Sequence, residues 1–264
     1  MSVLEQIVER VRERLAETKR RVPVPVVRRD AEAAAARPSF RAAIEAEGTS
    51  LIAEAKARSP SKGVLRDPYD PVALARAYAS AGARAVSVLT EPDFFDGAPA
   101  HLVAVRDAVA LPVLRKDFVV DEYQLWEAKA WGASAALLIV AALEDALLRD
   151  LRATAAAIGV DALVEVHTEA EAERALAAGA LIVGVNHRDL ATFRTERDAT
   201  ARVAKVVPKD VLLVSESGIK TRADVLEVER AGARAVLVGE ALVTSADPGA
   251  KTRELIGRAA GAPS

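Results

Sequence analysis

The chain has 264 residues, of which 51% are apolar and 28% are charged, and its formal net charge is −2. This nearly neutral balance argues against a nucleic-acid partner, and the absence of cysteine excludes disulfides, thiolate metal sites and a thiol nucleophile. No apolar run has the length of a membrane span and no segment near the N-terminus has the pattern of a signal peptide, so we expect a cytoplasmic protein without a membrane partner.

The first 48 residues predict a helical extension. Residues 3–15 place Leu4, Ile7 and Val11 at the spacing of one face of an amphipathic helix. A bend at VPVPVV (22–27) and a second helix through DAEAAAA (30–36) follow. We expect this extension either to cover the mouth of the unit formed by residues 49–264 or to seal its bottom.

Eight short apolar runs recur after residue 50 and predict strands. They are LIAEAK (51–56), AVSVLT (85–90), PVLRKDF (112–118), AALLIV (135–140), DALVEVH (161–167), LIVGVN (181–186), LLVSES (212–217) and AVLVGE (235–240). Three of the intervening helical segments end in A-G-A, where glycine is the expected C-cap. Eight strands separated by helices predict an α/β protein, a (β/α)₈ TIM barrel in one domain, 1–264. The alternative, an open doubly wound sheet, lacks its G-x-G-x-x-G signature after the first strand.

Polar residues gather where these predicted strands end, which is the end of a TIM barrel at which active sites lie. They are Glu54, Lys56, Ser59, Lys116, Glu165, His167, Asn186, Arg188, Glu216 and Ser217. One Lys–Glu pair is often only structural. Two lysines and at least two glutamates directed into one cavity would be costly to desolvate, so their convergence predicts an acid–base site.

Two further features concern phosphate and metal. SESGI and LVGEAL each place a glycine between a predicted strand and a helix, in the two loops where this fold often binds phosphate. His167 and His187 could contribute to a zinc site, but no third ligand has suitable spacing and a nearby lysine would repel the cation. We therefore expect no metal and no cofactor.

The chain resembles the indole-3-glycerol phosphate synthases of tryptophan biosynthesis. The resemblance covers nearly the whole length and lies in EAKARSPSKG, SVLTEPDFFDG, PVLRKDF, LVEVH, GVNHRDL, VSESGI and LVGEAL, in that order. It implies a carbon–carbon lyase that converts 1-(2-carboxyphenylamino)-1-deoxyribulose 5-phosphate to indole-3-glycerol phosphate, CO₂ and water. This is the fourth stage of L-tryptophan biosynthesis from chorismate. The implied partner is therefore this small phosphosugar–anthranilate substrate. Separately, we expect the protein to be a monomer.

The resemblance also implies residue roles. Lys116 would protonate the ketone oxygen during ring closure, and Glu165 with Lys56 would act in dehydration, although the sequence leaves open which lysine drives that step. The implied catalytic positions are Glu54, Lys56, Lys116, Glu165, Asn186 and Ser217. The implied substrate-binding positions are Ser59, Phe95, Phe118, Leu137, Arg188 and Glu216, with Gly218, Gly239 and Glu240 at the phosphate. The SPSKG loop (59–63) would close over the substrate.

Two positions depart from the family pattern. His187 stands where the family commonly has a second asparagine. Its side chain is expected to point out of the barrel, which favours a surface position over an effect on the loop. Ala241 stands where many relatives carry serine, which removes a hydroxyl from the phosphate site.

Three other functions stay open at this point. A phosphoribosyl isomerase would need Asp or Cys at the end of the first strand, where this chain has Glu54 and Lys56. A Schiff-base aldolase using Lys56 or Lys116 would be trapped by borohydride, and we expect no such adduct. A non-catalytic phospholigand-binding barrel would bind phosphate without turnover.

Overall fold

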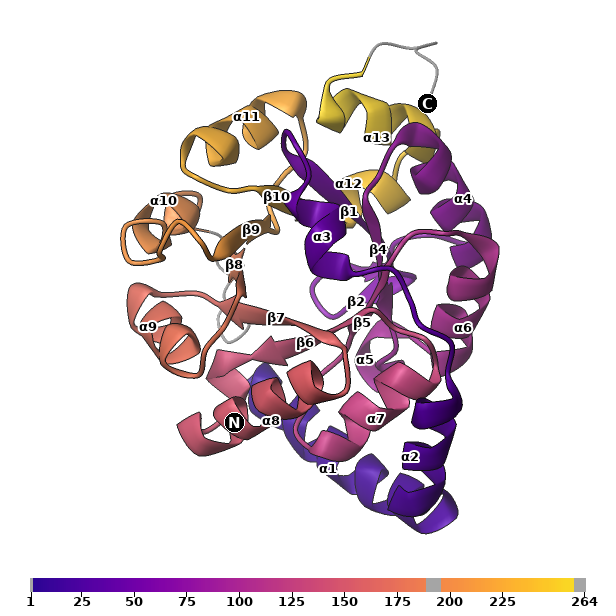
Figure 1. The fold of residues 1–264 in the computed structure, drawn as a ribbon. Coiled ribbons are helices and arrows are strands. Elements are labelled where there is room, and N and C mark those ends of the chain that lie inside the picture. Colours follow the sequence, from indigo (N-terminus) through magenta and orange to yellow (C-terminus); the bar gives the residue numbers. More distant parts are fainter. Residues whose placement is uncertain (1, 189–195, 259–264) are drawn as a thin grey trace.

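A computed structural model describes residues 2–188 and 196–258 of the chain. Eight parallel strands close into a barrel with helices around it, which confirms the predicted fold (Figure 1). Each strand pairs with the next one along the chain, and the last pairs with the first. The barrel strands are β1 (Ser50–Ala55), β4 (Ala85–Leu89), β5 (Val113–Lys116), β6 (Ala135–Ile139), β7 (Asp161–Val166), β8 (Ile182–Asn186), β9 (Leu212–Glu216) and β10 (Ala235–Val238).

The loop after β1 contains a small antiparallel hairpin, and the remaining elements are helical. The hairpin strands are β2 (Arg58–Ser59) and β3 (Gly63–Val64). The helices are α1 (Val3–Arg21), α2 (Val24–Ala33), α3 (Phe40–Glu45), α4 (Pro71–Ala81), α5 (Pro92–Phe95), α6 (Pro99–Ala108), α7 (Glu122–Ala130), η1 (Val140–Ala142), α8 (Asp145–Ala157), α9 (Glu169–Ala177), α10 (Ala199–Val203), α11 (Arg222–Arg230), α12 (Glu240–Val243) and α13 (Pro248–Ile256). None of the helices in the described ranges is long and apolar enough to cross a membrane.

Local signals in the sequence account for the helix ends. Helix α1 begins with a capping box in which Ser2 and Glu5 satisfy each other's backbone N–H groups. Helix α4 begins at an Asp70 cap and ends at Gly82, which has φ 98°. A left-handed conformation of this kind favours glycine, so the A-G-A pattern does mark the helix-to-strand junctions.

The N-terminal segment divides between the two ends of the barrel. Helix α1 reaches the loops that follow the strands, because Lys19 pairs with Asp121 at 2.7 Å beyond β5. Helix α3 lies at the opposite end, where the backbone N–H of Arg41 donates to Asp161 at the start of β7. Both expected positions of the extension are therefore occupied, by different helices. The second helix also begins earlier than predicted, inside VPVPVV, because Pro23 suits the N-cap position and Pro25 the first turn.

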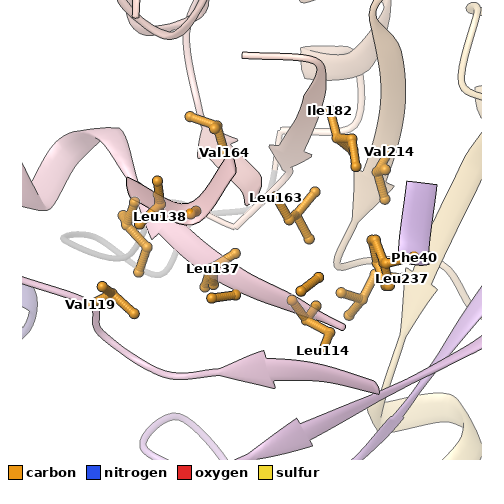
Figure 2. Packing of buried hydrophobic residues seen from close by; sticks show 14 of the residues in the cluster. Phe40, Leu114, Val119, Leu137, Leu138, Leu163, Val164, Ile182, Val214 and Leu237 are labelled. Carbon is orange, nitrogen blue, oxygen red and sulfur yellow. The ribbon is translucent and has the colours of Figure 1, made fainter. Parts of the chain in front are cut away.

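The barrel interior is filled with branched apolar side chains below the site. Leu114, Leu137, Leu163 and Leu237 come from four different strands and lie in the space that the strands enclose (Figure 2). Phe40 of α3 packs into the same cluster near Leu237 and is fully buried. A packed interior of this kind supports polar side chains only in the layer at the strand ends.

Candidate active site

A pocket of about 450 Å³ opens at the carboxyl ends of the barrel strands. This volume lies in the ordinary range for a small-molecule site. All fifteen residues that the sequence analysis assigned to catalysis, substrate binding or phosphate binding line it: Glu54, Lys56, Ser59, Phe95, Lys116, Phe118, Leu137, Glu165, Asn186, Arg188, Glu216, Ser217, Gly218, Gly239 and Glu240. The structure therefore brings together side chains that are separated by up to 186 positions of sequence, from Glu54 to Glu240.

One ion pair of the pocket comes from β1 and the residue after it. Glu54 and Lys56 point to the same face, as positions i and i+2 of a strand do, and Lys56 Nζ lies 2.5 Å from Glu54 Oε1. The side chain of Glu54 is buried, whereas Lys56 is more exposed to the pocket. The backbone of Gly239, at the end of β10, packs against this carboxylate: a Cβ there would lie 2.3 Å from Glu54 Oε1. Gly239 therefore makes room for the Glu54 side chain.

A second group of charges surrounds Lys116 at the end of β5. Lys116 Nζ donates to Glu165 Oε2 of β7 at 2.9 Å and to Glu216 Oε2 of β9 at 3.2 Å. Burial opposes the charge of Lys116, but Glu165, Glu216 and Glu54 together outweigh burial and raise its pKa. Lys116 is therefore held as the ammonium ion.

The two glutamates beside Lys116 differ in their pKa. Burial favours the neutral form of both, but Lys116 and His167 outweigh it at Glu165, with a smaller contribution from Asn186, so the pKa of Glu165 lies below its ordinary value. At Glu216 burial prevails, with help from Glu165 and Glu54, and raises the pKa to about 7. Two carboxyl groups with different proton affinities, placed on one ammonium, are the arrangement expected of an acid–base site.

An apolar slot lies beside these charges. Phe95 and Phe118 have ring centroids 6.0 Å apart, and Leu137 lines the same pocket. Val3, Leu4 and Ile7 of α1 also line this pocket, although they were not among the predicted site residues. Their helical spacing was visible in the sequence, but nothing local indicated which end of the barrel they would face.

The loops after β9 and β10 form the other end of the pocket. Ser217 has φ 67° and is followed by Gly218 with φ 78°, so the chain turns sharply at the strand end. A serine in this region costs on the order of 1–3 kcal/mol, and such strain concentrates at functional sites. Lys220 was also missed by the sequence analysis and lines the pocket here. The only indication of Lys220 in the sequence was its position two residues after Gly218.

The hairpin after β1 reaches across this end. Arg188 Nη1 donates to Ser61 Oγ at 3.3 Å, and Arg188 Nη2 lies 3.5 Å from Glu240 Oε2. Lys62 Nζ lies 3.7 Å from the other oxygen of Glu240. The last two residues of the motif GVNHRDL, 189 and 190, lie outside the described residues.

The two histidines at strand ends have other partners. His167 Nε2 lies 3.1 Å from the Arg188 carbonyl, and burial is outweighed by Glu171 and Glu165, which raise its pKa. The predicted surface position of His187 is wrong. Its side chain is buried behind β8 and β9, with Nε2 at 2.7 Å from Thr200 Oγ1 and 3.2 Å from Ser215 Oγ. A side chain that points out of a barrel strand packs beneath the surrounding helices, here α10, and does not reach solvent.

Comparison with known proteins agrees with this geometry. A family model described as "Indole-3-glycerol phosphate synthase" matches residues 4–255. A protein of that name from Mycolicibacterium vanbaalenii is 50% identical over 97% of this chain and 94% of its own length. Another from Streptomyces griseus is 48% identical over 99% of this chain and 97% of its own length.

Solved structures show the fold alone. A 3-hexulose-6-phosphate synthase from Salmonella typhimurium superposes with a TM-score of 0.65 over 79% of this chain and 97% of that one, at 16% identity. The family model and the two close relatives, in contrast, span almost the whole sequence. The chain belongs to the indole-3-glycerol phosphate synthase family.

Proposed function

We propose that the chain converts 1-(2-carboxyphenylamino)-1-deoxyribulose 5-phosphate to indole-3-glycerol phosphate, CO₂ and water. The observation that carries this proposal is the convergence of Lys56, Lys116 and Glu165 in one pocket, beside an apolar slot. The names of its close relatives also support it. The reaction has three demands, which are an acid for the ketone, a second acid–base pair and a place for an aromatic ring.

Ring closure needs the acid first. Attack by the arene carbon on the ketone forms a carbon–carbon bond and moves charge to the carbonyl oxygen. We assign Lys116 as the group that protonates this oxygen. Its raised pKa keeps the proton on the resting enzyme, and an alkoxide is basic enough to take it. Loss of CO₂ then restores the aromatic ring.

Dehydration needs a second acid and a base. The ring hydroxyl leaves as water once it receives a proton, and the neighbouring carbon loses one. Lys56 is assigned as the acid and Glu165 as the base, the latter because its lowered pKa keeps it a carboxylate. Glu54 holds Lys56 in place at 2.5 Å. Asn186 and Ser217 would orient Glu165 and the ribulose hydroxyls.

Binding divides between the two ends of the pocket. The anthranilate ring would fit between Phe118, Leu137 and Phe95, and aromatic packing of this kind suits offset or tilted rings. The phosphate would meet backbone N–H groups of Gly218, Gly239 and Glu240. Arg188 and Ser59 would contact the substrate between the two ends, and the hairpin carrying Ser61 and Lys62 would close over it.

The test is direct. The purified protein is incubated with the carboxyphenylamino deoxyribulose phosphate, and indole fluorescence is followed. We expect turnover by the wild-type protein and none by Lys116→Ala, with unchanged circular dichroism. Wild-type protein that forms no indole-3-glycerol phosphate would defeat the proposed reaction, and a normal rate for Lys116→Ala would defeat the assignment of the acid.

A further inference from the structure

The pocket holds more carboxylates than ammonium groups. At the inner ends of the strands Glu54, Glu165 and Glu216 face Lys56 and Lys116, so three negative charges meet two positive ones and leave an excess of one. The other cations that line the pocket lie with Glu240 at its more exposed rim, and they are Lys62, Arg188, Arg197 and Lys220. The side chains of Glu165 and Glu216 are 1% and 2% exposed. An uncompensated buried charge is costly, and the usual relief is to bind a proton.

Geometry identifies Glu216 as the group that binds this proton. Glu54 has Lys56 at 2.5 Å, and Glu165 is the nearer partner of Lys116, at 2.9 Å against 3.2 Å for Glu216. Glu165 and Glu216 each leave one oxygen, Oε1, without a hydrogen-bond partner among residues 2–188 and 196–258, so the longer contact with Lys116 is what sets Glu216 apart. Glu216 is thus the carboxyl group with the weakest compensation of its charge.

Gly184 of β8 allows Glu216 to take this position. A Cβ at Gly184 would lie 2.1 Å from Glu216 Oε1, so any side chain there would displace the carboxyl group. Gly184 pairs with Val214 and Glu165 in the neighbouring strands, inside the sheet rather than at a turn. Glycine in a strand interior weakens it and often marks a close approach, which here is the approach of Glu216.

We propose that Glu216 is a proton relay, which is protonated in the resting enzyme and returns to Lys116 the proton that Lys116 gives to the substrate. This inference rests on the proposed role of Lys116. Once Lys116 has become a neutral amine, its lone pair accepts a hydrogen bond in place of donating one. The O–H of Glu216 then donates across the same contact, and the pair becomes an ammonium and a carboxylate.

The protons of the reaction balance with this relay. The substrate oxygen receives two protons, one as the ketone becomes a hydroxyl and one as the hydroxyl leaves as water. One proton leaves carbon during dehydration, and CO₂ departs from a carboxylate without a proton. The net uptake is therefore one proton per turnover, which Glu216 supplies to Lys116 and then regains from solvent through the pocket mouth.

The relay makes activity depend on pH. The groups that face Glu216 are Lys116 from β5, Glu165 from β7 and Glu54 from β1, and burial with the two carboxylates places its pKa at about 7. Glu216 holds its proton below this pH and loses it above. We therefore expect kcat/KM to fall as pH rises through about 7.

The experiment compares Glu216→Gln with a matched control. Glutamine has the size of glutamate and can accept the Lys116 hydrogen bond, but it cannot relay a proton. We expect kcat to fall at least about tenfold, because a positioned acid contributes about 10²–10⁴-fold. We also expect the decrease of kcat/KM near neutral pH to be absent in this variant. The control, Glu127→Gln, removes another buried carboxyl group outside the pocket and should keep that limb of the pH profile.

Infrared spectra and a second variant test the relay independently. Infrared difference spectra between wild type and Glu216→Gln at pH 6 should show a protonated carboxyl band in the wild type, whether or not substrate turns over. Gly184→Ala should displace Glu216 and reduce kcat in the same direction. A Glu216→Gln variant with wild-type kcat and an unchanged pH profile, or spectra without the protonated band, would overturn the relay. Wild-type protein without turnover would instead defeat the proposed function.

Discussion

Strand β5 carries two adjacent cations that serve opposite faces of the barrel. Lys116 points inward to Glu165 and Glu216, whereas Arg115 points outward beneath α7. Arg115 donates to Asp117 at 2.9 Å, to Glu127 at 3.2 Å and to the Gln124 carbonyl at 2.6 Å, and its guanidinium lies 4.3 Å from the Trp131 ring centre.

The two networks differ in how fully they are satisfied. Asp117 accepts from Arg115 and from Thr90 through one oxygen and from the Phe118 N–H through the other. The inner network leaves one oxygen of Glu165 and one of Glu216 without a partner among the described residues. Each network has one carboxylate in excess. In the outer network this is Glu127, whose side chain is 11% exposed, and in the inner network it is Glu216, whose side chain is 2% exposed. A saturated network stabilises the fold, whereas an unsaturated one keeps its groups available for proton transfer.

The same substitution at both cations should separate these roles most clearly. Lys116→Met removes the proposed acid, so we expect kcat to fall by at least about 10³-fold, within the range reported for general acids and charge stabilisation. The melting temperature should change by only a few degrees, because Glu165 can take up a proton once its cation is gone. Steady-state rates and thermal melts measure the two effects.

Arg115→Met should have the opposite profile. It leaves Asp117 buried without its cation, and breaking a buried pair in this way costs about 3–5 kcal/mol. At roughly 2–4 °C per kcal/mol, the melting temperature should fall by on the order of 10 °C. The folded fraction should retain most of its kcat at low temperature. An Arg115→Met protein with a wild-type melting temperature and no activity would contradict the division between the two faces.

Glu216→Gln should stabilise the protein at high pH. The folded-state pKa of Glu216 is raised from 4.5 to about 7, so the folded state loses stability as pH rises through this window and carries the full penalty above it. Removing the charge should recover up to about 2–3 kcal/mol at pH 8 and almost nothing at pH 4. Melts at the two pH values test this, and equal gains at both would contradict it.

Ala241→Ser should give the smallest effect. Ala241 lines the pocket next to Glu240, and a hydroxyl there could donate to the substrate phosphate. One added hydrogen bond contributes about 0.5–1.5 kcal/mol, which corresponds to a KM lower by about two- to tenfold with kcat unchanged. A change in kcat alone would place the hydroxyl at the wrong end of the pocket.

The sequence predicted the barrel and its mouth because both follow from local rules. Strand and helix signals alternate with regular glycine caps, and residues such as Glu54, Lys116 and Glu216 share a strand end and an inward phase. It could not predict that His187 is buried, because the helix that covers it, α10, is short and contributes its partner Thr200 from further along the chain. It also could not place Leu4 and Ile7 at the pocket, since an amphipathic face fits either end of a barrel.

The anchoring of α1 has a practical consequence for handling the protein. Arg14 pairs with Glu91 and Asp93 after β4 and so fixes α1 beside the strand ends, and Val3 and Leu4 of its first turn line the pocket. An affinity tag joined directly before this turn would therefore stand at the substrate entrance. Purification handles belong at the other terminus, or behind a spacer long enough to clear the opening.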